Sequence, residues 1–132
     1  MVKTVVIGGK TMQMRASALT PRIYRREFGR DMFRDMSQLL AAYRRRSALT
    51  AASTEDEIAE ADLAILGSLE IFENLAWVFL RDGGEDVGGS PDEWLGDLDG
   101  VFTVYELMPS ILELWGATQV STSSLKNPAG QR

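Results

Sequence analysis

The chain has 132 residues, of which 45% are hydrophobic and 25% are charged, which suits one globular domain with a single core. It contains no cysteine and no histidine, which excludes disulfides, thiolate metal sites, cysteine nucleophiles and histidine-based catalysis. Because no apolar run is long enough for a signal peptide or a membrane span, we expect an intracellular protein with no membrane partner.

The net charge of −5 conceals an uneven distribution along the chain. Residues 1–50 carry a net +8, residues 51–116 a net −15 and residues 117–132 a net +2. Such opposite charges attract each other, either within one chain or head-to-tail between copies. Because salt screens exposed charges, contacts between copies should weaken as the ionic strength rises.

The N-terminus predicts a β-hairpin over residues 2–15. The segment VKTVVI is β-branched and apolar, and Gly8 and Gly9 are a turn signal. Met12 and Met14 alternate with polar residues, so they should share one face of the second strand. An isolated hairpin is marginally stable in water, so it should pack on helices or pair with another chain.

Two helices are predicted next. Thr20 as N-cap and Pro21 at the first helical position begin one that ends at Gly29. A second helix covers about residues 30–46, because its apolar residues follow a spacing of three and four. Its stripe consists of Met32, Phe33, Met36, Leu39, Leu40 and Tyr43.

One long helix is predicted from Thr54 to about Arg81. Thr54 and Glu57 match a capping box at its start. From Leu75 onward the helix is apolar nearly all round, so we expect this half to be the centre of the core. The helical seam is Ile58, Ala61, Ile65, Leu69, Phe72, Ala76 and Phe79, thickened by Leu63, Leu66, Ile71, Leu75 and Val78.

A break and a short helix follow. Residues 82–89, DGGEDVGG, contain four glycines and predict a flexible acidic surface loop or hinge. Ser90 and Pro91 repeat the cap-then-proline pattern and predict a short helix that includes Trp94 and Leu95.

A last helix is predicted over about residues 102–116, with Pro109 expected to kink it or to split it after Leu107. Residues 117–132 are polar and predict a disordered tail. The sequence therefore predicts a mainly α fold: one helical domain over residues 1–116, with an N-terminal β-hairpin and four to five helices.

Three arginines are candidate partner-binding residues. Arg22, Arg26 and Arg30 fall at i, i+4 and i+8, and would line one helical face if the chain turned only gently at Gly29. We interpret them as a solvated face or as ion pairs between subunits. The alternative is a small nucleic-acid-binding regulator that uses the basic N-terminal half, although no aromatic residues suited to base stacking interleave the arginines.

Two tryptophans are further candidates. Trp94 and Trp115 lie on short elements beside acidic residues, where a half-exposed indole can anchor a partner. The alternative for each is core packing, which we also expect for Trp77.

The remaining polar clusters predict no chemistry. The acidic residues between 55 and 62 suit the first turn of a solvated helix, and nothing supplies facing metal ligands. The loop 82–89 has no lysine before the next helix and would repel a phosphate. We therefore expect a protein with no catalytic, metal or cofactor site, which is not an enzyme.

Residues 18–36 (ALTPRIYRREFGRDMFRDM), residues 69–80 (LEIFENLAWVFL) and residues 102–116 (FTVYELMPSILELWG) resemble, in order, the tail assembly chaperones of long-tailed, siphovirus-type bacteriophages and prophages. The resemblance covers about residues 3–116. These motifs are helix-packing patterns, so no binding residue is carried over from the family.

The resemblance implies a homo-oligomer that binds and solubilises the phage tape-measure protein and helps to recruit subunits of the major tail (tube) protein. It implies a place in the host bacterial cytoplasm during assembly and absence from the mature virion. Family members often have a longer, frameshifted form, and the polar end from Ala117 resembles the junction to it.

Overall fold

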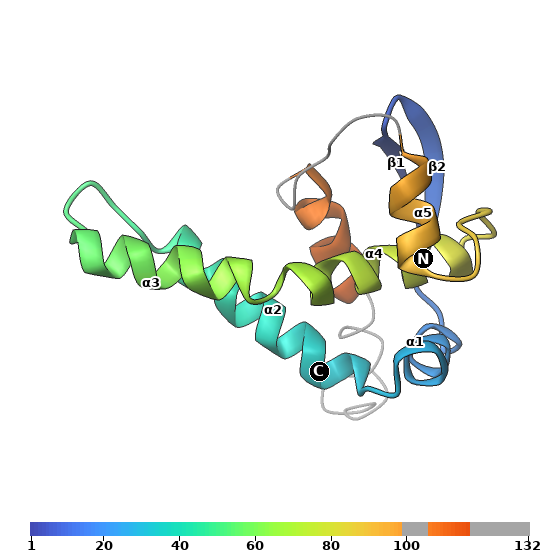
Figure 1. The fold of residues 1–132 in the computed structure, drawn as a ribbon, viewed down its shortest axis with the longest axis horizontal. Coiled ribbons are helices and arrows are strands. Elements are labelled where there is room, and N and C mark those ends of the chain that lie inside the picture. The colour runs from blue at the N-terminus through green and yellow to red at the C-terminus, as the bar shows by residue number, and fades with distance from the viewer. Residues whose placement is uncertain (99–105, 117–132) are drawn as a thin grey trace, which may run out of the picture.

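The computed structural model describes residues 1–98 and 106–116. Its described residues form six helices and an N-terminal two-stranded antiparallel hairpin (Figure 1), so the predicted mainly α class with a hairpin is confirmed. The elements are β1 (Val2–Ile7), β2 (Lys10–Arg15), α1 (Thr20–Phe28), α2 (Met32–Ser47), α3 (Glu55–Leu66), α4 (Leu69–Asp82), α5 (Pro91–Asp97) and a C-terminal helix whose described residues are 106–116.

The hairpin has the predicted form. Gly8 and Gly9 make its turn at φ values of 57° and 80°, a region that favours glycine. Val5 pairs with Met12, and both side chains face the protein together with the fully buried Met14. Strand β2 packs on α4, so the hairpin gains its stability from the helices of its own chain.

Helix α1 begins one residue earlier than predicted, with Leu19 rather than Thr20 as its N-cap. The hydroxyl of Thr20 is used elsewhere, because it accepts the N–H of Ser17 at 2.8 Å and donates to Asp82 at 2.6 Å. The helix ends, as predicted, at Gly29, which has a φ of 66°.

The long helix predicted from Thr54 to Arg81 is two helices. The capping box of Thr54 and Glu57 is present, but α3 ends at Leu66, and α4 starts at Leu69 after a bend of 42°. Gly67 and Ser68 occupy the break, where glycine's low helix propensity makes interruption inexpensive. This break gives the fold six helices instead of four to five.

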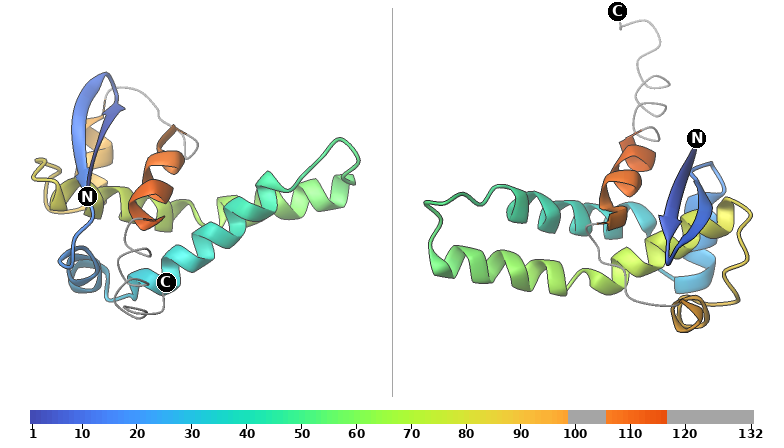
Figure 2. Two further views of the ribbon diagram at one scale, coloured as in Figure 1. Left: turned by 180° about the vertical axis from the view of Figure 1, so that it is seen from behind. Right: turned by 90° about the horizontal axis from the view of Figure 1, so that it is seen from above.

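The bend sends α3 away from the core along α2. Figures 1 and 2 show α3 side by side with the C-terminal part of α2, and together these segments project from the rest of the molecule as an α2–α3 arm. The first part of α2 belongs to the core through Met32, Met36 and Leu39. Only Ala61 and Ile65 of α3 are buried, and they pack on the side of α2 that contains Ala42. None of the described helices alone is long and apolar enough to cross a membrane, whereas α3 and α4 meet that test only as a bent pair.

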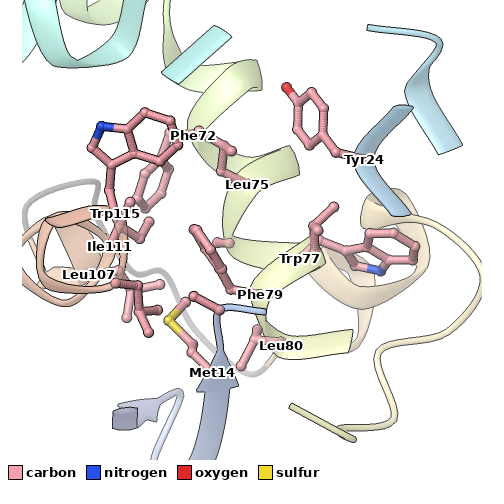
Figure 3. Close-up of a cluster of buried hydrophobic side chains, with 14 of the residues drawn as sticks. Met14, Tyr24, Phe72, Leu75, Trp77, Phe79, Leu80, Leu107, Ile111 and Trp115 are labelled. Carbon is pink, nitrogen blue, oxygen red and sulfur yellow. The ribbon is translucent and has the colours of Figure 1, made fainter. Parts of the chain in front are cut away.

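Helix α4 is the centre of the core, as predicted. Its residues from Leu75 to Leu80 are at most 1% exposed, and side chains from β2, α1 and the C-terminal helix surround them (Figure 3). The Trp77 indole lies in this core and donates its N–H to the carbonyl of Val87 at 3.0 Å, which confirms its predicted core position.

The loop after α4 is a surface loop, one of the two predicted alternatives, in which Gly84, Asp86, Gly88 and Gly89 are exposed, and it contacts β2. The Glu85 carboxylate accepts the backbone N–H of Gln13 at 2.8 Å, and Val87 is only 3% exposed. Gly83 lies directly against the backbone of Gln13. Helix α5 then begins at the predicted signal, with the Ser90 hydroxyl accepting the N–H of Glu93 at 3.3 Å.

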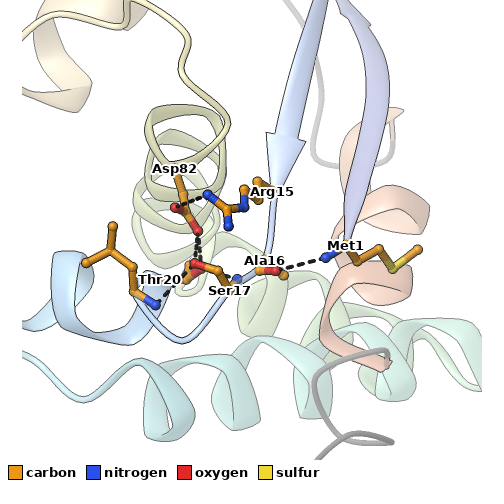
Figure 4. A network of polar contacts seen from close by, with 7 residues as sticks. Met1, Arg15, Ala16, Ser17, Thr20 and Asp82 are labelled. Carbon is orange, nitrogen blue, oxygen red and sulfur yellow. Dashed lines mark hydrogen bonds and ion pairs between the residues drawn. The ribbon is translucent and has the colours of Figure 1, made fainter.

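A buried carboxylate joins the end of α4 to the segment between β2 and α1 (Figure 4). Asp82 accepts hydrogen bonds from the hydroxyls of Ser17 at 2.7 Å and Thr20 at 2.6 Å, and Arg15 lies 4.0 Å away. The network fixes the hairpin and α1 relative to the core helix.

The C-terminal helix is continuous from residue 106 to residue 116, so Pro109 does not split it after Leu107 as predicted. Ile111 is buried against the core, with Leu107, Met108, Leu114 and Trp115. The predictions for residues 102–105 and for the tail, 117–132, lie outside the described residues.

Candidate protein-binding surfaces

Some of the opposite charges of the two halves form ion pairs within the chain. Among the described residues, three ion pairs join a cation of the basic N-terminal half to a carboxylate of the acidic half: Lys3–Glu113 at 2.7 Å, Arg46–Asp62 at 3.1 Å and Arg15–Asp82 at 4.0 Å. Within residues 1–98 and 106–116, however, six exposed arginines have no ion pair. They are Arg22, Arg25, Arg26, Arg34, Arg44 and Arg45.

The predicted stripe of Arg22, Arg26 and Arg30 does not form. Arg30 lies beyond the left-handed Gly29, and its guanidinium makes two hydrogen bonds of 2.6 and 2.7 Å to Asp35. The exposed cations of α1 are instead Arg22, Arg25 and Arg26, which we call the α1 arginine face.

Asp35 links α1 to α2. Its carboxylate is buried and also accepts the hydroxyl of Tyr24 at 2.6 Å. The hydrogen bonds from Arg30 hold the pKa of Asp35 below its usual range, with a smaller contribution from Tyr24. Burial, followed by the hydrogen bond to Asp35, raises the pKa of Tyr24 well above its ordinary value. All these partners belong to the chain itself, so the trio stabilises the fold.

Neither candidate tryptophan is half-exposed. Trp94 is 4% exposed and belongs to the core cluster, so its indole has little surface to offer a partner. Trp115 is 8% exposed, and its ring centroid lies 5.1 Å from that of Phe33. Of the two, Trp115 also lines a groove, through which a partner can reach it.

That groove lies between α2 and the C-terminal helix and has a volume of about 630 Å³. Sequence periodicity places Leu40 and Tyr43 in the core stripe of α2, but both are only partly buried. The lining contains one cation, Arg44, and no carboxylate. We call it the α2/C-terminal groove; it is lined by Ser37, Leu40, Tyr43, Arg44, Leu112, Trp115 and Gly116.

The second apolar surface lies on α3. Leu63 is 67% exposed and Leu66 is 61% exposed, although the helical pattern places both beside the core seam. Ile58, which the pattern places in the seam, is also exposed, at 37%. The prediction is wrong for these residues because, within the described part of the chain, α3 packs mainly on α2 and buries one narrow side. The exposed strip of Ala59, Leu63 and Leu66 is the α3 apolar face.

The acidic start of α3 is a solvated first turn, as predicted. Glu55, Asp56 and Glu57 are exposed, and Glu57 closes the capping box. Hydrogen bonds from the backbone and then the hydroxyl of Thr54 lower the pKa of the Glu57 carboxyl. Among the described residues, no group of three or more Asp or Glu side chains is arranged to hold a metal ion.

The surfaces described here are therefore the α1 arginine face, the α2/C-terminal groove and the α3 apolar face. Comparison of the chain with known proteins gives no match to a protein-family model, to a curated protein or to a solved structure.

Proposed function

We propose that this protein is a non-enzymatic tail assembly chaperone of a long-tailed bacteriophage or prophage. In the host cytoplasm it binds the tape-measure protein, keeps it soluble and helps to recruit subunits of the major tail protein, and it leaves before the virion is complete. The observation that carries this proposal is the resemblance of residues 18–36, 69–80 and 102–116, in order, to that family.

The described parts of these stretches contact one another in the structure. Phe28 of the first stretch lies 5.9 Å, between ring centroids, from Trp77 of the second. Phe33 of the first lies 5.1 Å from Trp115 of the third. The resemblance therefore concerns residues that pack together, which supports a likeness of fold. Binding depends on the exposed surfaces.

The surfaces suit a protein that holds long amphipathic helices. The apolar side of such a helix is stabilised when it packs on apolar surface of a partner. The α2/C-terminal groove and the α3 apolar face both provide exposed apolar side chains for this packing. Exposed arginines add contacts that salt weakens, which suits a chaperone that must leave.

The test is co-expression with the tape-measure protein encoded beside it, followed by pull-down and measurement of the soluble fraction. We expect the tape-measure protein to stay soluble and to co-purify. Reversing charge on the α1 arginine face, with Arg22→Glu and Arg26→Glu together, should reduce the co-purified fraction severalfold because both side chains are exposed and have no ion pair among the described residues.

The control is Lys10→Glu, which reverses an exposed cation at the hairpin turn. It should leave capture unchanged, and circular dichroism should show that each variant folds. If the tape-measure protein precipitates while this protein elutes alone, the chaperone proposal fails.

The α1 arginine face also favours a second candidate, a small nucleic-acid-binding regulator. Its basis is Arg22, Arg25 and Arg26, exposed on one short helix with no ion pair among the described residues. This function requires retention on heparin or DNA at low salt, lost steeply as salt rises. Elution at low salt would exclude it.

A further inference from the structure

The α3 apolar face contains two large hydrophobic side chains of the arm that are more than half exposed, Leu63 at 67% and Leu66 at 61%. Leu63 and Leu66 lie three residues apart and Ala59 four residues before Leu63, so all three share one side of the helix. Exposed carboxylates border the strip: Glu60 lies three residues before Leu63, and Asp62, which pairs with Arg46 of its own chain at 3.1 Å, lies four before Leu66. The surface is thus an apolar strip between acidic edges.

The α2/C-terminal groove has the complementary character. Ser37, Leu40 and Arg44 lie along one side of α2, at i, i+3 and i+7. Leu112 and Trp115 line it from the C-terminal helix. Arg44 is exposed and has no ion pair among the described residues. A helix with an apolar strip and acidic edges matches this apolar lining and its single cation.

Both surfaces are open in one molecule. Helix α3 packs on the other side of α2, where Ala41, Ala42 and Arg45 face Ala64 and Gly67 across a smaller cavity. A partner in the groove therefore does not compete with the chain's own α3. The arm projects from the rest of the molecule (Figure 2), and Leu63 and Leu66 of α3 are exposed.

Charge decides which surface the α3 apolar face can join. Two α3 helices placed face to face would bring Glu60, which has no ion pair among the described residues, near the Glu60 of the other copy, and like charges repel. Placed in the groove, the edge that carries Glu60 approaches Arg44. The second arrangement is favoured because it buries apolar surface and pairs opposite charges.

We propose that α3 of one copy docks, through Ala59, Leu63 and Leu66, in the α2/C-terminal groove of a second copy. The contact is heterologous, so each added copy leaves one free groove and one free α3, and the assembly grows into a chain or closes into a ring. The proposal deepens the oligomeric part of the proposed function, and its test uses this protein alone, so it can fail or succeed independently of tape-measure binding.

Sedimentation velocity over a range of protein concentrations tests the contact. The face variant is Leu63→Gln with Leu66→Gln, and the groove variant is Ser37→Glu with Arg44→Glu; all four positions are exposed, so the fold should survive. We expect the wild type to assemble with concentration, less at high salt, and each variant to weaken assembly at least about tenfold.

Two matched controls test whether any loss of an exposed leucine, or any reversal of an exposed arginine, weakens assembly. Leu19→Gln removes a leucine that is 47% exposed outside the arm, and Arg25→Glu reverses an exposed cation on α1. Both should assemble as the wild type does.

Mixing the two variants identifies the arrangement. The face variant keeps an intact groove and the groove variant keeps an intact α3, so the mixture should form a defined 1:1 dimer that grows no further. A wild type that stays monomeric, a face or groove variant that assembles normally, or a mixture that stays monomeric would each overturn the proposal; a groove variant that assembles normally would indicate an α3–α3 contact.

Discussion

At the scale of single residues, two buried aspartates join elements of the fold, a role that the sequence pattern attributes to hydrophobic residues. Asp35 connects α1 to α2 through Tyr24 and Arg30, and Asp82 connects α4 to the segment that follows β2. Each lies on a side of its helix that is otherwise apolar. A charged residue at such a position is the signal in the sequence from which the burial of the two aspartates could have been predicted. A buried carboxylate with several donors costs little, whereas removing its charge leaves those donors unpaired.

Asp35→Asn should destabilise the protein by about 1–3 kcal/mol at neutral pH, because it weakens charge-assisted hydrogen bonds and compromises the acceptor of the buried Tyr24 hydroxyl. The pKa of Asp35 is lower in the folded protein, so its ionised form stabilises the fold above the unfolded-state pKa of about 4. That contribution is lost as the pH falls from about 4 through the folded-state pKa. Urea unfolding between pH 3 and pH 7, a range that includes the unfolded-state pKa of about 4, measures the destabilisation and its dependence on pH.

The control is Asp97→Asn, at an exposed position on α5 where the side chain makes no hydrogen bond or ion pair with the described residues. Its stability should equal that of the wild type at every pH. A stability difference between Asp35→Asn and the wild type that stays constant as the pH falls would contradict the assigned role of the charge.

At the scale of elements, the close approach of α4 to β2 sets the position of the hairpin. Gly83, at the end of α4, has an ordinary φ of −77°, so it is not needed for backbone conformation. It is needed for space, because a Cβ there would collide with the carbonyl oxygen of Gln13 and lie 2.9 Å from its carbonyl carbon. Backbone atoms cannot rotate away as a side chain can.

Gly83→Ala should therefore destabilise the protein by about 1–3 kcal/mol, by forcing β2 away from α4. Thermal or urea unfolding measures the cost. Gly96→Ala is the matched control, because a Cβ on this α5 residue meets nothing within 4 Å and alanine favours helix. Equal stabilities for the two variants would show that the hairpin tolerates displacement.

At the scale of the whole molecule, the chain divides into a packed body and the α2–α3 arm. Helix α4 buries nine residues in the body, whereas α3 buries two. The arm depends on contacts of α3 with α2, and it carries the α3 apolar face that we assign to self-association. Its low burial therefore places the proposed docking element in a weakly stabilised part of the described fold.

Native-state hydrogen exchange should show this division directly. In dilute protein, where copies are apart, the amides of α3 should exchange faster than those of α4, because local opening of α3 exposes few buried side chains. At concentrations that favour assembly, docking in a neighbouring groove should slow the exchange of α3. Equal protection of α3 and α4 in dilute protein would contradict the division into body and arm.

Local signals in the sequence determined much of the fold. The hairpin follows from alternation around Gly8 and Gly9, the start of α3 from the capping box at Thr54, and the core position of α4 from a helix that is apolar all round. These features depend on residues close together in the chain, which is why periodicity and capping predict them.

Tertiary structure alone decided which side chains reach solvent. Leu63 and Leu75 lie in one predicted helix, yet the bend at Gly67 exposes the first and buries the second. Arg30 does not lie in the predicted arginine stripe because its guanidinium binds Asp35 on the next helix. Burial and pairing depend on which other element covers each face, and that information comes from residues distant in the sequence.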